Sequence, residues 1–309
     1  MDQILQELEK HGFRARSVSI SHLAELKEAV DKRYDKGEFS EEFYRERLID
    51  FRFEPPESLA RACTIIIAAF PQPKIQVVIR LFDKPFPLII PPTYQHYPDS
   101  VMGRLLKRIL KPAGYRLART ILPLKLLATR SGLGYYGRNN ICYVPGMGSY
   151  HRLMAFYSDY PAIDDFWQTA KLMKSCAKCL ACLRNCPTGA ISPERFLLHA
   201  ERCLTYLNEK AGDFPAWVNP ARHNSLVGCL ECQDVCPENL PFEKWIEPGE
   251  DFSEEESLLL MQSGSPEKIP LSLRKRLQNL SLMEYIELLP RNIQSLIVTP
   301  LKIFRNLEK

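Results

Sequence analysis

The spacing of the cysteines restricts the fold of this chain more than any other feature of its sequence. Eight of the ten cysteines in the 309 residues lie between positions 176 and 236. The first four follow the pattern C-x2-C-x2-C-x3-C-P and are Cys176, Cys179, Cys182 and Cys186, with Pro187 after them. The second pattern, C-x2-C-x3-C-P, is one cysteine shorter and comprises Cys229, Cys232 and Cys236, with Pro237. The isolated Cys203 brings the total to eight, so the segment offers two sets of four thiols.

The first pattern is typical of bacterial ferredoxins that hold two [4Fe–4S] clusters. Three thiolates spaced two residues apart wrap one cluster, while the fourth cysteine of the run ligates the other cluster. This crossover rule predicts two ligand sets. One set is Cys176, Cys179, Cys182 and Cys236, and the other is Cys186, Cys203, Cys229 and Cys232.

Two other uses of cysteine fit this chain less well. Disulfides belong mainly to secreted proteins, and the start MDQILQELEK has neither the basic nor the apolar region of a signal peptide. No apolar run approaches the ~18 residues of a membrane span, so we expect a cytoplasmic protein. Zinc also binds four cysteines, but the first run does not have zinc-ribbon spacing. The sequence therefore predicts an iron–sulfur protein that transfers electrons.

A basic segment precedes the cysteines. Residues 100–158 contain ten Lys or Arg and no Asp or Glu, whereas the rest of the chain has 31 basic and 37 acidic residues. The ten are Arg104, Lys107, Arg108, Lys111, Arg116, Arg119, Lys125, Arg130, Arg138 and Arg152. Such a segment indicates an anionic partner, either nucleic acid or a phosphate-bearing cofactor. The alternative is a solvated basic face that pairs with carboxylates elsewhere in the chain.

The apolar periodicity predicts an α+β fold in three parts. Residues 1–165 read as an α/β domain, 166–245 as a double-cluster ferredoxin-like domain, and 246–309 as a linker with a short helical tail. In the first part we expect helices at 2–11, 21–34 (capped by Ser21), 40–51 and 99–111, and strands at 13–20, 62–70, 76–82, 86–90, 140–144 and 153–157. The Glu-rich stretch 251–257 reads as a linker or surface loop, and the tail helices are expected at 254–262, 270–279, 281–288 and 291–306.

A glycine-rich stretch, RSGLGYYGRNN, occupies residues 130–140. Its glycines Gly132, Gly134 and Gly137 formally match G-x-G-x-x-G and permit close approach of the backbone to a ligand. A dinucleotide site is poorly supported, because the stretch does not follow a predicted strand and no acidic residue follows it until Asp159. A second small-residue loop, 145–149, is near in sequence and a candidate for the same cavity.

The order of these motifs resembles that of the epoxyqueuosine reductases, a cobalamin- and iron–sulfur-dependent group related to the reductive dehalogenases. The resemblance runs from about residue 55 to 245 and is carried by SGLGYYGRNN, PGMGSY, YSDYP, CPTGAI, RCLTYL and the cysteine spacing. It implies that the first part of the chain is a cobalamin-type domain and that two clusters deliver electrons to the cobalt. It also implies that Gly132, Gly134, Gly137, Arg138, Asn140 and Ser149 contact cobalamin. Arg138 is a departure, since the family usually has Lys there.

The resemblance further implies that a protein acid and low-valent cobalt remove the epoxide oxygen from a tRNA wobble base. The family carries this acid as an Asp in a V-D-x-x-P stretch before the glycine loop. The corresponding residues here, 118–123, are ARTILP and contain no carboxylate. Other proton sources for the reaction are Tyr94, His96, Tyr97, Asp99, Tyr135, Tyr136 and His151, of which Tyr97, Asp99 and His96 are the first to test.

Three hypotheses for function follow from the sequence. The first is a cobalamin-dependent reductase of the epoxyqueuosine reductase type, supplied by an external low-potential electron donor, with a substrate that differs if the missing Asp matters. In this hypothesis tRNA or another anionic substrate contacts the 100–158 segment. The second is a non-catalytic electron carrier of the double-cluster ferredoxin type. The third is a cobalamin-binding accessory protein without turnover.

Overall fold

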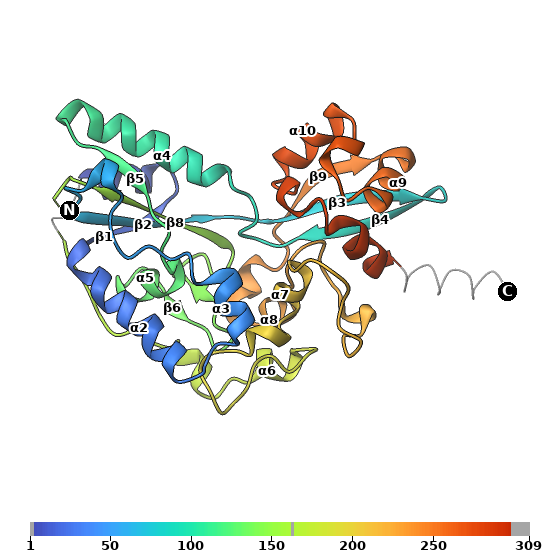
Figure 1. Ribbon diagram of the computed structural model, residues 1–309, viewed down its shortest axis with the longest axis horizontal. Helices are drawn as coiled ribbons and strands as arrows, with labels where there is room; N and C mark the ends of the chain where they lie inside the picture. The colour runs from blue at the N-terminus through green and yellow to red at the C-terminus, as the bar shows by residue number, and fades with distance from the viewer. Residues whose placement is uncertain (1–2, 162–163, 298–309) are drawn as a thin grey trace.

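The computed structural model describes residues 3–161 and 164–297 and confirms a mixed α+β fold. Figure 1 shows a main sheet with helices on both of its faces, a second sheet that extends away from it, and the cysteine-rich segment beside the first sheet. No helix in the described ranges is long and apolar enough to cross a membrane.

The main sheet has the strand order β1-β2-β8-β5. Its strands are β1 (Arg14–Ser19), β2 (Thr64–Pro71), β8 (His151–Ser158) and the short β5 (Leu117–Arg119). All three of its pairings are antiparallel. The N-terminal part is therefore not an α/β unit, which would have a parallel sheet, and that part of the predicted fold class is wrong. The sequence pattern located β1, β2 and β8 but missed the short β5, and it could not give the direction of the strands.

The two faces of the main sheet are covered by different helices, because successive strand residues point to opposite sides. Ile66 and Ala68 of β2 pack under α1 (Gln3–Lys10) and α4 (Tyr97–Leu110). Ile65 and Ile67 face the other way, toward α2 (Leu23–Asp35) and α5 (Leu124–Arg130). Both faces of β2 are thus buried, which explains the continuous apolar run in its sequence.

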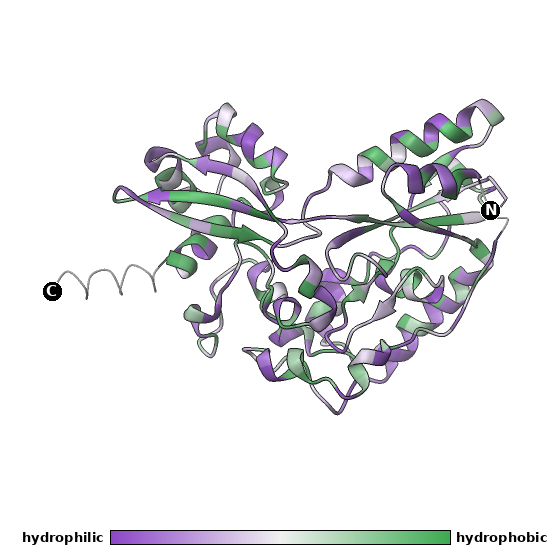
Figure 2. Ribbon diagram, turned by 180° about the vertical axis from the view of Figure 1, so that it is seen from behind, coloured by the Kyte–Doolittle hydropathy of each residue, from purple (hydrophilic) through white to green (hydrophobic). Residues whose placement is uncertain are grey.

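The second sheet, ordered β4-β3-β9, joins two distant segments of the chain. The hairpin β3 (Lys74–Leu81) and β4 (Lys84–Ile90) is antiparallel, and β9 (Ile246–Phe252) pairs with β3 in parallel. Helices α9 (Glu254–Gln262) and α10 (Leu271–Asn279) pack on it around Phe252, Leu260 and Leu273. Figure 2 shows hydrophobic residues along much of the β3–β4 hairpin, where this core forms.

The prediction of a linker at 251–257 is wrong. Residues 251–252 end β9, and the Glu-rich run that follows is the capped first turn of α9. The Ser253 side chain accepts a hydrogen bond from the Glu256 backbone N–H, and the Glu256 carboxylate accepts one from the Ser253 N–H. Carboxylates in a first turn also interact favourably with the helix dipole.

The remaining elements are short. They are α3 (Glu41–Arg47), β6 (Tyr135–Tyr136), β7 (Cys142–Tyr143), α6 (Ala181–Asn185), α7 (Leu204–Asn208) and α8 (Glu231–Asp234). Ser21 does not cap α2; Ser19 caps the 3-10 turn Ile20–His22 that leads into it. The predicted helix at 281–288 is a 3-10 turn, Met283–Tyr285. Residues 289–297 are helical, and the predicted continuation to 306 lies outside the described residues.

Candidate functional site

The eight cysteines of the motifs lie in two groups. In one group, Cys182 interacts electrostatically with Cys176, Cys179 and Cys236. In the other, Cys203 interacts with Cys186 and Cys229, and Cys232 with Cys229 and Cys203 and also with Cys182 of the first group. The two ligand sets expected from the crossover rule stay a prediction, and we call the second one the second cluster set.

Burial raises the pKa of five of these thiols, which are Cys176, Cys182, Cys203, Cys229 and Cys232. The pKa of Cys182 rises to about 11 and that of Cys229 to about 12, so these two thiols hold their protons at neutral pH. Metal ligation must therefore release protons, as is general for thiolate sites. Among the residues that the structure describes, no three Cys, His, Asp or Glu side chains are close enough to hold a single metal ion.

The asparagines after the glycine-rich loop connect the main sheet region to the cysteine segment. Asn139 Nδ2 donates to the Cys232 carbonyl oxygen at 3.3 Å. Asn140 Nδ2 donates to the Phe196 oxygen at 2.6 Å, and Asn140 Oδ1 accepts from the Leu198 N–H. The neighbouring Arg138 donates to the carbonyl oxygen of Cys176 at 3.1 Å.

The loop at 145–149 makes a second connection. Ser149 Oγ donates to Gln233 Oε1 at 2.8 Å, and the Ser149 N–H donates to Asn239 Oδ1 at 2.9 Å. Gly148 has φ +55°, and a Cβ there would lie 2.4 Å from Asn239 Oδ1, so only glycine fits. The two loops singled out by the sequence thus fix the cysteine segment to the rest of the fold.

The three glycines expected to contact cobalamin are packed against the protein itself. A Cβ on Gly134 would lie 2.6 Å from the Tyr143 carbonyl oxygen, and one on Gly137 would lie 2.6 Å from the Tyr143 ring. On Gly132, which has φ +73°, it would lie 2.7 Å from the Phe166 ring. The stretch also runs from helix α5 into strand β6, whereas a dinucleotide fingerprint runs from strand to helix.

A space that we call the inner cavity lies between the main sheet region and the cysteine segment. It consists of two hollows of about 440 and 660 Å³ that share Leu124, Lys125 and Leu198 in their walls. All four cysteines of the second cluster set line the smaller hollow, together with Ser149 and Asn139. The larger hollow is mostly apolar. Asn140 lines it, together with the aromatic residues Phe39, Phe43, Phe51, Tyr136 and Phe196.

Lys125 is the unusual charge of the inner cavity. Its side chain has exposed surface, and that surface faces both hollows. Surrounding protein nevertheless desolvates the ammonium group and lowers its pKa, against a weaker opposing attraction from Cys203, Cys142, Cys232 and Glu209. The Lys125 side chain forms no hydrogen bond or ion pair with any residue in the described part of the chain.

The other titratable groups in the wall are engaged or neutral. Burial lowers the pKa of His151 to about 4, so this imidazole is uncharged at neutral pH, and its buried Nδ1 has no partner among the described residues. Tyr94 donates its hydroxyl hydrogen to Glu209. Glu231 accepts hydrogen bonds from the side chains of Asn185 and Asn224.

The first three predicted proton donors lie near the start of α4, and none lines the inner cavity. Asp99 forms an ion pair with Arg152 at 2.6 Å and lies 3.6 Å from Arg119. His96 contacts Glu284 at 3.1 Å. The Tyr97 side chain is exposed, with its ring edge against Phe70. Of the seven candidates from the sequence, Tyr94, Tyr136 and His151 do reach the cavity wall.

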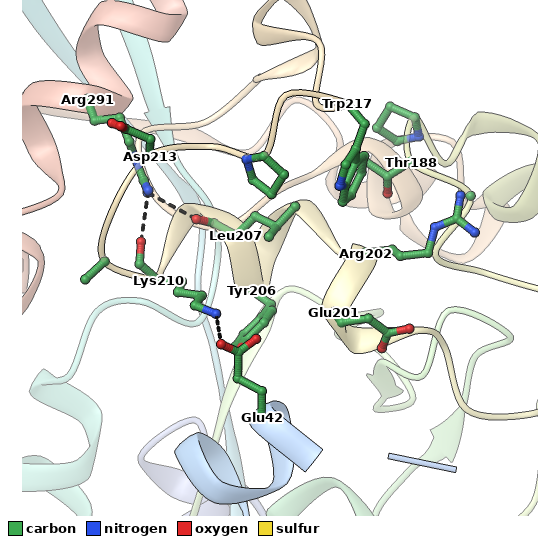
Figure 3. Close-up of a pocket in the computed structure, with 14 residues that line it drawn as sticks. Glu42, Thr188, Glu201, Arg202, Tyr206, Leu207, Lys210, Asp213, Trp217 and Arg291 are labelled. Atoms are coloured by element: carbon green, nitrogen blue, oxygen red, sulfur yellow. Dashed lines mark hydrogen bonds and ion pairs between the residues drawn. The ribbon is translucent and has the colours of Figure 1, made fainter. Parts of the chain in front are cut away.

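A separate hollow of about 820 Å³, which we call the outer pocket, lies on the surface of the cysteine segment (Figure 3). Its wall carries six charged residues, which are Glu42, Glu201, Arg202, Lys210, Asp213 and Arg291. Most of them pair with protein groups: Lys210 with Glu42, Glu201 with His199, and Arg291 with four carbonyl oxygens. Arg202 is exposed, and Trp217 is 53% exposed.

Much of the basic segment pairs with carboxylates, as its alternative interpretation predicted. Ion pairs join Arg108 to Glu7, Arg116 to Asp159, Arg119 and Arg152 to Asp99, and Arg130 to Glu25. The exposed side chains of Arg104, Lys107 and Lys111 remain on α4 or directly after it. This helix covers the face of the main sheet opposite to α5, so these charges lie across the sheet from the inner cavity (Figure 1).

Comparison with known proteins bears on the cysteine segment first. The family model described as "4Fe-4S double cluster binding domain" matches residues 175–239. The chain therefore contains a domain that binds two [4Fe–4S] clusters. It is 37% identical over 132 residues to an epoxyqueuosine reductase of Pseudomonas aeruginosa, an overlap of 41% of this chain and 35% of that protein. A Vibrio cholerae epoxyqueuosine reductase is 28% identical over 258 residues, covering 77% of this chain and 66% of that protein.

The resemblance to epoxyqueuosine reductases is confirmed. In the most similar segments the chain spans about a third of the length of the curated relatives, which are oxidoreductases. Solved structures extend the likeness of fold. An epoxyqueuosine reductase from Bacillus subtilis superposes with a TM-score of 0.66 at 21% identity, over 96% of this chain and 80% of that one. One from Streptococcus thermophilus gives 0.61 at 20% identity, over 99% and 85%.

Sequence reasoning missed the residues that distinguish the inner cavity. Lys125 was counted only as one of ten basic residues, and nothing in its local sequence separates it from the others. The only available signal was that Lys125 lies at the start of α5, a helix that begins directly after Pro123. Asn139 and Gln233, which help to join the two regions, also carried no spacing pattern of their own.

Proposed function

We propose that this chain is an iron–sulfur reductase. Electrons from an external low-potential donor pass through the two clusters to a ligand held in the inner cavity. The observation that carries this proposal is that all four thiols of the second cluster set line that cavity. The second cluster itself takes up part of the smaller hollow, and a group in the larger hollow of about 660 Å³ then lies beside that cluster. A simple electron carrier has no need of such a ligand space.

We further propose that cobalamin occupies part of the inner cavity. The larger hollow is within the size range of complete ligand sites, and it shares three wall residues with the smaller hollow, part of which the second cluster fills. The apolar wall and the unpartnered Nδ1 of His151 suit a broad ring with polar substituents. Asn140 and Ser149 line the hollows and would hold it, while Gly132, Gly134, Gly137 and Arg138 would act by shaping the loop behind it. When bound, cobalamin supplies low-valent cobalt as the reductant of the substrate.

The proposed substrate class is a modified tRNA base that carries an epoxide. A solved structure with the same fold, with a TM-score of 0.66 at 21% identity, contains an epoxyqueuosine reductase with an epoxyqueuosine-modified tRNA-Tyr stem-loop. Removal of the oxygen breaks two C–O bonds, forms a C=C bond and releases water, which consumes two electrons and two protons. The exposed cations Arg104, Lys107 and Lys111 are candidate phosphate contacts, although RNA would have to reach around the sheet from the cavity to meet them.

The acid that the resemblance implies is missing from this chain. Residues 117–119 form the edge strand β5, and Thr120 Oγ1 after it donates to the Ala155 carbonyl oxygen at 3.1 Å. Of residues 118–123, Leu122 and Pro123 line the inner cavity, and neither carries an acid. A positioned general acid contributes about 10²- to 10⁴-fold in rate. We therefore propose weak epoxyqueuosine reduction by this chain, with a related substrate as its better one.

The test uses anaerobic protein with both clusters reconstituted. We expect its visible spectrum to change on addition of cobalamin with one-to-one uptake, and conversion of an epoxyqueuosine stem-loop to be slow. A protein with full iron content that takes up no cobalamin would contradict the cofactor proposal and leave the electron carrier. Cobalamin uptake without turnover of any epoxide-bearing RNA would favour the accessory protein. Turnover equal to that of an enzyme with the Asp would contradict the role given to its absence.

A further inference from the structure

Lys125 has exposed surface and lines both hollows of the inner cavity. In the described part of the chain it has no ion-pair partner, and the wall of the larger hollow is mostly apolar. The buried Lys74, by comparison, is paired with Asp234 at 2.9 Å. The counter-charge of Lys125 therefore comes from a group bound in the cavity, either the second cluster or a ligand beside it.

Lys125 is also the one cation of the inner cavity that is free to bind, as far as the described residues show. Arg33 in the wall is paired with Glu38 at 2.5 Å, and Arg152 is paired with Asp99. Neutral His151 and the bonded Tyr94 bring no charge, and Glu231 brings an acceptor. The ammonium group thus offers three N–H donors to a ligand, and no other unpaired cation of the described residues lines the cavity.

Lys125 reaches the cavity from a fixed support. It lies in the first turn of α5, where Leu127 and Ala128 pack into the core against β2 and β8. Leu124 and Leu198 line both hollows together with Lys125. These residues mark the boundary between the smaller hollow, next to the second cluster set, and the larger apolar hollow. A group bound by Lys125 therefore lies at the junction, between the electron source and the space that accepts the bulk of a substrate.

We infer that Lys125 binds the electronegative atom that the substrate loses on reduction, the epoxide oxygen in the proposed substrate class. A positive charge at this atom favours the negative charge that develops there as the C–O bond breaks. This role takes the place of electrophilic assistance that a carboxylic acid gives in the family. The inference rests on the proposed function, since it assumes that a reducible substrate enters the inner cavity.

The test compares RNA binding by matched variants, with no turnover needed. The probes are one stem-loop that carries epoxyqueuosine and the same stem-loop with queuosine, which lacks the oxygen. Wild-type protein should bind the epoxide form more tightly, because only that form offers the oxygen to Lys125. A hydrogen bond to a charged group contributes about 1.5–3 kcal/mol, so Lys125→Met should reduce this preference about 10- to 100-fold. Lys125→Arg should retain part of it.

The controls separate a ligand role from a structural one. Lys275→Met removes an exposed lysine of α10 and should leave both affinities unchanged. All variants should keep the iron content of the wild type, so that lost preference is not lost folding. The reduction potential of the second cluster should become more negative in Lys125→Met, since a nearby positive charge is removed, and stay unchanged in Lys275→Met.

Each contrary outcome has a distinct meaning. A potential that shifts while the epoxide preference persists would assign Lys125 to the cluster alone and overturn the inference. Wild-type protein that takes up cobalamin but does not prefer the epoxide form, or binds neither RNA, would overturn it as well and leave the cofactor proposal standing. Failure of fully iron-loaded protein to take up cobalamin would instead contradict the proposed function.

Discussion

The inner cavity and the outer pocket both border the second cluster set, and they differ in what surrounds their unpaired cation. In the outer pocket, Lys210 and Arg291 are held by protein groups, and the unpaired Arg202 is exposed. In the inner cavity, Arg33 and Arg152 are paired, and the unpaired cation is Lys125, which is also exposed but whose pKa is lowered by the desolvation of its surroundings. Four cluster thiols line the inner cavity, whereas no cysteine of the described residues lines the outer pocket.

The difference teaches which hollow to regard as a ligand site. The outer pocket, at about 820 Å³, is larger than either hollow of the inner cavity. Most of its charges are nevertheless paired within the fold. The inner cavity combines the four thiols of the second cluster set with an unpaired cation, Lys125. The chemistry of the lining, and not volume, therefore identifies the candidate active site.

The largest expected effect concerns Cys203, which lines the inner cavity while the adjacent Arg202 lines the outer pocket. If Cys203 is a cluster ligand, Cys203→Ala should lose one of two clusters, or about four of eight iron atoms. Cys142→Ala is the matched control, since Cys142 also lines the inner cavity but belongs to neither ligand set. Iron and sulfide analysis of anaerobic protein measures both. Full iron in Cys203→Ala would show that the assigned ligand sets are wrong.

A smaller effect tests the structural nature of the outer pocket. Arg291 donates to the carbonyl oxygens of Leu207, Asn208, Lys210 and Gly212, which closes the end of α7, and its guanidinium lies 3.9 Å from the Phe214 ring centroid. Arg291→Ala should lower the free energy of unfolding by about 2–3 kcal/mol, because buried carbonyl groups lose a charged donor. Arg202→Ala should change it by less than about 0.5 kcal/mol. Denaturant unfolding of both variants provides the measurement; equal losses would contradict the distinction between held and free charges.

The parts of the fold that the sequence predicted are those governed by local spacing. The cysteine run indicated a double-cluster segment because its ligands are close in sequence, and the apolar runs indicated β2 and α4. The failures required long-range pairing. Strand β9, with the polar sequence IEPGEDF, reads as a loop, and it becomes a strand through pairing with β3 about 170 residues earlier.

The candidate site was predictable to the same extent. Asn140 and Ser149 were singled out from small-residue loops, and both do line the inner cavity. Lys125 could not be singled out, because the cavity that it lines forms only where Val30 of α2, Phe43 of α3 and Phe196 of the cysteine segment meet around one space. A charge count in sequence places all ten basic residues together, while the fold pairs some, leaves others on the far side of the sheet and brings this one to the cavity wall.

The central claim is that the inner cavity, and not the outer pocket, holds the ligand that the clusters reduce. Its most direct test fills each space with one indole side chain. Ala29 of α2 lines the inner cavity and Ala211 lines the outer pocket. Cobalamin binding, followed by visible absorption of anaerobic protein with equal iron content, should weaken at least tenfold in Ala29→Trp and stay unchanged in Ala211→Trp. Unchanged binding in Ala29→Trp together with lost binding in Ala211→Trp would contradict the account.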